Sequence, residues 1–212
     1  MQNFLALDTS GNHLSVIACK EGNIQRVFLP NCAMKHAVSL MPAVEEALEK
    51  ANLSLDECDF FSAVVGAGSF TGIRIGISAV KGFCLAFDKP ALPVTSFDVI
   101  AYNALKDDSS KILCLIDALH DSYYACGYEN GKVCYEPAYV TEEEVLALQE
   151  KGYRLYASSP LPIGEKVWLG VVAPDEGLRK AVEALVARGK WGELTALYVR
   201  KSSAELNLEN KA

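Results

Sequence analysis

Two short polar segments in the first third of the chain have the composition of phosphate-binding turns. The first, Asp8-Thr9-Ser10, ends an apolar run and offers a carboxylate and two hydroxyls, groups that bind a nucleotide phosphate or its Mg²⁺. The second, Gly66 to Thr71 (GAGSFT), lies between the apolar run FFSAVV and a helical pattern, where free N–H groups and the helix dipole face an anion. A tight structural turn is the alternative for each segment. The candidate nucleotide-binding residues are Asp8, Thr9, Ser10, Gly66, Gly68 and Ser69.

This candidate nucleotide site is incomplete in the sequence. No Gly-Lys-Ser/Thr follows the glycines, and Thr71 stands where a dinucleotide fingerprint needs its third glycine, although a nicotinamide-type fold with Asp98 as the ribose acid remains an alternative. In the second half, Asp117 precedes Ala118-Leu119-His120, which offers neither a glycine nor a hydroxyl to a phosphate. The three histidines and seven cysteines lack metal-ligand spacing, and no hydrolase signature is present. We therefore predict neither catalytic residues nor a metal site.

Composition limits the classes of partner. With 212 residues, half of them apolar, the chain can bury a real core, and its net charge of −7 repels nucleic acid and anionic lipid surfaces. Most cysteines lie inside apolar runs without a C-x-x-C pair, which is typical of reduced, buried thiols. No uncharged apolar run is long enough to span a membrane, and Met1-Gln2-Asn3 lacks the basic start of a signal peptide. We expect a cytoplasmic protein that contacts RNA only locally or through a partner.

The hydrophobic pattern predicts an α/β protein whose architecture repeats. Three short apolar runs come first, then a helix at 35–51, and the same meander begins again after the polar patch 106–110. Asp8 and Asp117 each end the first strand of a half, which indicates two similar lobes; chance recurrence of a common hairpin is the alternative. We predict a first lobe over 1–105 and a second over 106–212, with a tail that returns to the first lobe. The expected strands are 3–8, 14–19, 24–29, 60–65, 91–96, 112–119, 123–129 and 133–140, and the further helices are 72–87, 97–105 and 141–149.

The helix predicted at 72–87 has a flank of small residues, Gly72, Gly76, Ala79, Gly82 and Ala86, which lets another backbone approach closely. That backbone could belong to the same chain or to another molecule, and the amphipathic helix at 36–51 is the natural neighbour. If the partner is another molecule, the expected interface residues are His36, Leu40, Val44, Gly72, Arg74, Gly76, Ala79 and Val80.

The glycine segment also carries a family resemblance. Gly66 to Gly76 (GAGSFTGIRIG) resembles the GPGSFTGLRIG signature of the TsaB (YeaZ) family, with Ala67 in place of proline. Asp8-Thr9-Ser10 and His36 with Leu40-Met41-Pro42 match further family positions, whereas Ala37 and Val38 replace a Ser-Glu pair, and Leu119 and Ser122 replace the Arg and Glu of the family's second-lobe DARRGEVY. The matching residues near the end are Tyr198, Arg200, Ser202, Ala204 and Glu205.

The resemblance implies an actin-like (ASKHA, ribonuclease H-like) duplicated fold and a non-catalytic subunit of the machinery that makes threonylcarbamoyladenosine (t6A) in tRNA. It implies a TsaD-like transferase and a TsaE-like ATPase as partners, a homodimer when alone, and tRNA contact only through the complex. It implies no obligatory cofactor, with ATP or ADP allowed at the subunit contact. The metal-binding H-x-x-x-H pair of the catalytic relatives corresponds to Ser96 and Ile100, which cannot replace imidazoles. The alternative is a stand-alone ASKHA-type ATP-dependent enzyme or a glycoprotease-like peptidase.

Overall fold

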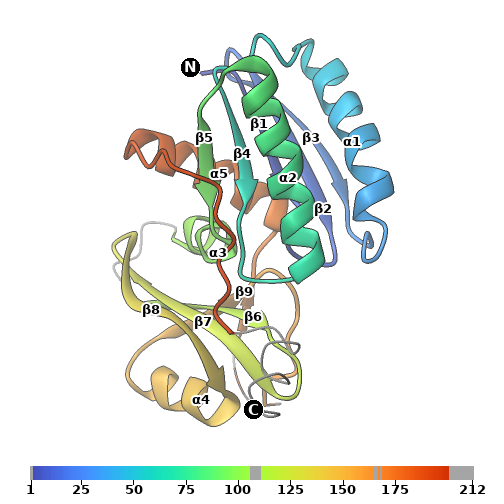
Figure 1. The fold of residues 1–212 in the computed structure, drawn as a ribbon. Coiled ribbons are helices and arrows are strands. Elements are labelled where there is room, and N and C mark those ends of the chain that lie inside the picture. The colour runs from blue at the N-terminus through green and yellow to red at the C-terminus, as the bar shows by residue number, and fades with distance from the viewer. Residues whose placement is uncertain (1, 106–110, 165–166, 168, 201–212) are drawn as a thin grey trace, which may run out of the picture.

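Two five-stranded mixed sheets, one from each half of the chain, form the frame of the molecule (Figure 1). The computed structural model describes residues 2–105, 111–164, 167 and 169–200. The first sheet has the strand order β3-β2-β1-β4-β5 and the second β10-β9-β6-β7-β8. The strands are β1 (Phe4–Asp8), β2 (Leu14–Lys20), β3 (Asn23–Leu29), β4 (Phe60–Val64), β5 (Ala91–Val94), β6 (Ile112–Asp117), β7 (Ser122–Glu129), β8 (Lys132–Thr141), β9 (Arg154–Ala157) and β10 (Leu169–Val171).

The two sheets repeat one connectivity. In each, the first strand pairs antiparallel with the second and parallel with the fourth, so β6 to β10 correspond in order to β1 to β5. Among the described residues no helix of the second half corresponds to α2, and the connection between β9 and β10, residues 158–168, is shorter than the 18-residue α2 between β4 and β5. The predicted two lobes of sheet and flanking helices are confirmed. The helices are α1 (His36–Ala51), α2 (Phe70–Phe87), α3 (Ser96–Ala104), α4 (Glu142–Glu150) and α5 (Pro174–Ala187).

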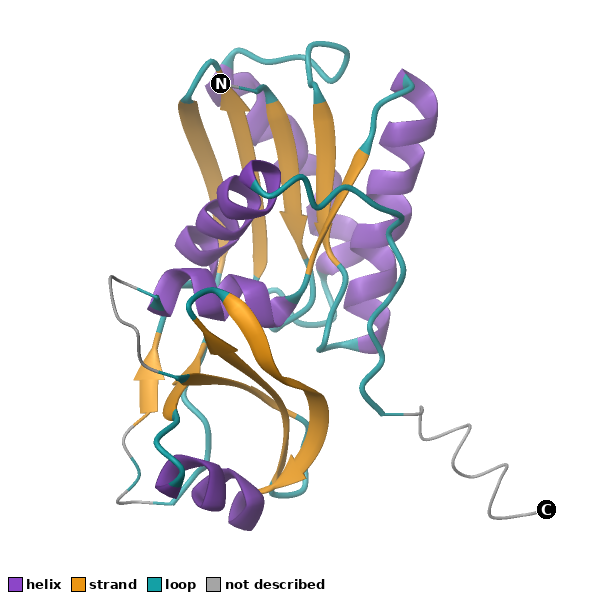
Figure 2. Cartoon of the chain, turned by 90° about the vertical axis from the view of Figure 1, so that its left-hand side faces the viewer, coloured by secondary structure: helices purple, strands orange, loops and turns teal. Residues whose placement is uncertain are grey.

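The last helix of each half packs on the sheet of the other half. α3 follows β5 of the first sheet but buries Phe97 and Ile100 in a cluster with Ile112 and Cys126 of the second sheet. α5 follows β10 but packs on the first sheet, in a cluster that includes Phe4 and Leu92. Figure 2 shows α3 and α5 one above the other between the two sheets, in direct contact. Each lobe therefore contributes to the core of the other.

An irregular segment, residues 189–200, runs down from α5 across both lobes (Figure 1), and we call it the strap. Leu194 is buried in the core of the first lobe, and the Leu197 N–H donates to the Val65 carbonyl at 2.7 Å. Arg200 then reaches the second lobe, where Nη1 donates to the Tyr139 hydroxyl. The division at 105/106 stays a prediction, but the chain after residue 173 clearly lies on the first sheet as well as the second.

Most predicted elements are present, with shifted ends and three additions. α2 begins at Phe70, two residues early, because the Ser69 side chain caps it by accepting from the Gly72 N–H. Asp98 closes a capping box with Thr95 at the start of α3 and accepts from the Tyr128 hydroxyl, so it is not a ribose acid. β9, β10 and α5 were not predicted. The patch 106–110 and the matches Ser202, Ala204 and Glu205 lie outside the described residues.

Candidate functional site between the lobes

Asp8 ends β1 at the junction of the two lobes, and its carboxylate is only 2% exposed. One oxygen, Oδ1, accepts from the Ser10 backbone N–H at 2.8 Å and from the Ser10 hydroxyl at 2.7 Å. The other, Oδ2, lies 3.0 Å from Nε2 of His13, five residues further along the β1–β2 turn. Both carboxylate oxygens therefore have partners from the same turn, and the partner that sequence reasoning missed is His13.

The charges of this pair stabilise each other. Burial by itself would raise the pKa of Asp8, but the His13 charge and hydrogen bonds from His13 and Ser10 outweigh it, so the pKa is lowered. Burial would likewise lower the pKa of His13, and the Asp8 charge and hydrogen bond raise it instead. Both pKa shifts favour an internal ion pair in which the imidazole is the cation.

The glycine loop packs against the Asp8-Thr9-Ser10 turn and is not open to a phosphate. A Cβ on Gly68 would lie 2.3 Å from the Ser10 carbonyl oxygen, and one on Gly72 only 2.0 Å from that of Thr9. The Ser69 N–H donates to the Ser10 carbonyl at 2.7 Å, and the Thr9 hydroxyl donates to the Gly72 carbonyl at 2.7 Å. The two predicted nucleotide-binding segments thus lie together, as expected for one site. They pack directly on each other, however, and several of their polar groups form hydrogen bonds with each other.

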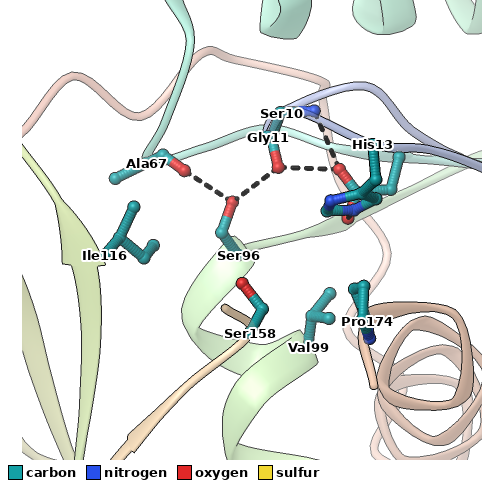
Figure 3. A pocket seen from close by; sticks show the side chains of 10 residues that line it. Ser10, Gly11, His13, Ala67, Ser96, Val99, Ile116, Ser158 and Pro174 are labelled. Carbon is teal, nitrogen blue, oxygen red and sulfur yellow. Dashed lines mark hydrogen bonds and ion pairs between the residues drawn. The ribbon is translucent and has the colours of Figure 1, made fainter. Parts of the chain in front are cut away.

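The cavity beside the Asp8 turn is small. The cavity beside Asp8 has a volume of about 30 Å³, which accommodates a water molecule or two but not a nucleotide. In Figure 3 a chain of hydrogen bonds crosses it, from the Ser96 hydroxyl at the start of α3 to the Ala67 carbonyl at 2.6 Å and the Ser10 hydroxyl at 3.1 Å. The residues that line the cavity are Asp8, Ser10, Gly11, His13, Ala67, Ser96, Val99, Ile116, Ser158 and Pro174. A metal-bound nucleotide does not fit this arrangement.

The turn of the second lobe that corresponds to the Asp8-Thr9-Ser10 turn has no glycine and is not shaped as a phosphate loop. Asp117, the counterpart of Asp8, is exposed and accepts from the nearby Leu119 N–H at 2.7 Å. The turn after it has three non-glycine residues in the left-handed region, Leu119, His120 and Asp121. Ile100 is fully buried against the second sheet, so of the two positions that correspond to the relatives' metal ligands only Ser96 faces the cavity. Among the described residues no three His, Cys, Asp or Glu side chains form a group that could hold a metal ion.

The expected interface residues need correction. Six of them are buried inside the chain itself: Gly72 and Gly76 lie against Thr9, and most of the others lie in the core of the first lobe. Arg74 is exposed and Ala79 half-buried. The predicted amphipathic helices are present, and the small-residue flank of α2 is buried in its first part, at Gly72 and Gly76, and exposed in its later part, at Gly82 and Ala86. The buried six are His36, Leu40, Val44, Gly72, Gly76 and Val80, and the exposed residues of α2 are Phe70, Thr71, Arg74, Ser78, Lys81, Gly82, Leu85 and Ala86.

Fold and site together define a two-lobed protein of duplicated α/β sheets whose cleft is closed by its own side chains. The family model described as "TsaD: tRNA N6-adenosine threonylcarbamoyltransferase" matches residues 23–167. The tRNA threonylcarbamoyladenosine biosynthesis protein TsaB of Escherichia coli (strain K12) is 31% identical over 131 residues, 60% of this chain and 56% of that protein. The tRNA N6-adenosine threonylcarbamoyltransferase of Staphylococcus haemolyticus (strain JCSC1435) is 33% identical over 106 residues, 42% of this chain and 31% of that one.

Solved structures give the same relationship over nearly the whole chain. YeaZ from Pseudomonas aeruginosa superposes with a TM-score of 0.78 at 26% identity, covering 93% of this chain and 100% of that chain. The chain belongs to the family of that model and, within it, to its TsaB (YeaZ) branch, with the duplicated two-lobed α/β fold predicted from the sequence. It spans about half the length of the curated TsaB relatives it matches.

Proposed function

We propose that this chain is a non-catalytic scaffold and activator subunit in t6A biosynthesis, which binds a TsaD-like transferase through the exposed faces of α1 and α2. The proposal includes a homodimer through the same surface when the chain is alone, a TsaE-like ATPase in the assembled complex, and tRNA contact through the complex only. No cofactor is obligatory for this role, and ATP or ADP would bind, if at all, where two subunits meet. The expected location is the cytoplasm.

The observation that carries the proposal is a small apolar patch on the outer face of α2, formed by Gly82, Leu85 and Ala86 beside the polar Ser78 and Lys81. α2 packs one side on β4, yet Leu85 on its other side is 88% exposed, and Gly82 and Ala86 are exposed beside it. By length and composition alone α2 could cross a membrane, but a core helix passes the same test. An exposed apolar helix face with small residues favours contact with a helix of another protein. The proposed interface on α2 is therefore the later, exposed part of the small-residue flank, Gly82 and Ala86 with Leu85, and not the buried Gly72 and Gly76.

α1 extends the proposed surface. It lies beside α2 over the same face of the first sheet (Figure 1), and its outer side exposes Val38 and Met41. Met34, in the turn before α1, is fully exposed. The closed cavity beside Asp8 also supports a non-catalytic role, because nothing the size of a nucleotide can enter it.

The test of the proposed interface places a large side chain on the exposed face of α2, at a position where the chain itself has room for it. A Cβ on Gly82 would meet no atom within 4 Å, so Gly82→Tyr should fold normally while it holds a partner helix away from α2. Ala147→Tyr on α4 is the matched control, an exposed helix position in the other lobe. With the cognate TsaD-like protein, the wild type and Ala147→Tyr should co-elute in size exclusion, and Gly82→Tyr should elute alone. Co-elution of folded Gly82→Tyr would refute the interface.

The second candidate is a stand-alone enzyme, favoured by the match to a transferase family model. Purified protein that hydrolyses ATP or peptide without a partner, and loses that activity in Asp8→Ala, would establish it and overturn the scaffold proposal. Loss of activity without loss of the fold has to be shown, because Asp8 also stabilises the chain.

A further inference from the structure

Actin-like ATPase folds imply a metal-bound nucleotide between their lobes, and Asp8 is the carboxylate that would face its cation. In this chain the carboxylate faces an imidazole instead, with His13 Nε2 at 3.0 Å from Oδ2. We infer that His13 takes the position of the divalent cation at Asp8, so that an internal ion pair has replaced the metal-nucleotide site of the first lobe. This inference goes beyond the proposed function and does not depend on it.

The His13 ring is held in place on two sides. A Cβ on Gly11 would come within 2.9 Å of the ring, so the turn backbone lies directly against it, and Phe28 of β3 contacts it with ring centroids 5.7 Å apart. The His13 carbonyl also accepts from Nε2 of the buried His36, which ties the turn to α1. A side chain packed in this way does not swing aside at low cost when a cation approaches.

The oxygen ligands that a cation would need are nevertheless present around the ring. The Asp8 carboxylate and the Ser10 and Ser96 hydroxyls lie on one connected network beside the cavity, and hard divalent cations prefer such oxygen donors. At present these groups bind one another and His13. Removing the imidazole would enlarge the cavity and leave the buried Asp8 carboxylate without its cation, which is the condition for binding a metal ion from solution. His13 is therefore the residue that keeps the site closed.

The test uses Mn²⁺ as the probe, because free Mn²⁺ gives an electron paramagnetic resonance signal that falls on binding. His13→Ser should bind Mn²⁺ at least tenfold more tightly than the wild type, and the gain should disappear in His13→Ser/Asp8→Asn. His120→Ser is the matched control, a histidine removed from an exposed turn of the other lobe. His13→Gln, whose amide can still donate to Asp8, should bind Mn²⁺ no more tightly than the wild type. A folded His13→Ser that binds no more Mn²⁺ than the wild type would overturn the inference.

The wild type supplies a measurement that needs no variant. The pKa of His13, followed by NMR of its ring, should be the same with and without millimolar Mg²⁺. A fall of that pKa in Mg²⁺ would mean that the cation competes for Asp8, and it would refute the inference even if His13→Ser failed to fold. The interface experiment with Gly82→Tyr is independent of both results, so failure of one proposal leaves the other standing.

Discussion

The two lobes share one connectivity but differ at the cleft. In the first lobe, the connection between β4 and β5 contains α2, and the Asp8 turn is buried under the glycine loop. In the second lobe, the corresponding connection has no room for such a helix, and Asp117 is exposed. The strand frame therefore does not need the helix or a buried acid. Those features stabilise the first lobe alone, where they form tight contacts that the second lobe lacks.

The largest expected effect comes from Gly72, where α2 touches the Asp8-Thr9-Ser10 turn. Gly72→Ala places a Cβ 2.0 Å from the Thr9 carbonyl oxygen, a clash with backbone that only a shift of α2 or of β1 can relieve. We expect a loss of more than about 4 kcal/mol in the free energy of unfolding. Urea unfolding followed by circular dichroism measures it. A loss below about 1 kcal/mol would mean that the first lobe does not depend on this contact, and the contrast between the lobes would weaken.

The matched acids at the ends of β1 and β6 give the second prediction. Asp8→Ala removes one partner of a buried ion pair and should cost roughly 3 to 5 kcal/mol. Asp117→Ala removes an exposed carboxylate that accepts from one N–H of its own turn, and should cost about 1 kcal/mol or less. The same urea experiment compares the two variants. If both variants lost the same free energy of unfolding, the view that only the first lobe buries polar groups at the cleft would be contradicted.

The sequence predicted β1 to β8 because turn residues set off their apolar runs, and Pro90 and Pro93 marked even the four-residue β5. β9 and β10, with four and three residues, were too short to show a pattern without such markers. α5 could have been found, because Pro174 begins it and Leu178, Ala181 and Leu185 repeat at helical spacing. The position of α5 on the sheet of the other lobe could not have been predicted, because the spacing of apolar residues does not show which sheet a helix covers.

The sequence also predicted only part of the candidate site, because local composition does not show which groups pack against each other. Local composition brought Asp8 and the glycine loop together correctly, because turns at strand ends meet at the same edge of a sheet. The sequence could not show that a Thr9 oxygen fills the Gly72 flank, since both a partner and the chain itself can use small residues. The sequence held one signal for His13, which lies in the short turn between the two strands predicted at 3–8 and 14–19 and therefore near Asp8.

The pH dependence of stability should follow the Asp8–His13 pair. The raised pKa of His13 gives stability that is present below about pH 6.5 and is lost as the pH rises through the folded-state pKa. The lowered pKa of Asp8 gives stability that is present above about pH 3.9 and is lost as the pH falls through the folded-state pKa. Stability from the pair is therefore greatest between these limits, with Asp175 as a further acid that favours charged His13.

His13→Gln isolates the alkaline side of this profile. Other carboxylates contribute to the acid side in every variant, but the decline above about pH 6.5 should flatten when the titrating imidazole is gone. Urea midpoints between pH 5 and 9 measure it, and His120→Gln in the second lobe should leave the decline as it is. An unchanged decline in His13→Gln would assign it to groups outside the pair.

Gly82→Ala, ten residues after Gly72→Ala on α2, should change the free energy of unfolding only slightly. At Gly82 a Cβ meets nothing within 4 Å, and the backbone is ordinary helix, so Gly82→Ala gains helix propensity without a clash. We expect the free energy of unfolding to rise by about 0.5 to 1 kcal/mol. Opposite signs for Gly72→Ala and Gly82→Ala would divide α2 into a flank required by the first lobe and a face that the fold leaves free. A loss at Gly82 would instead mean that the outer face of α2 is already packed within the chain, and the surface offered to a partner would have to lie elsewhere.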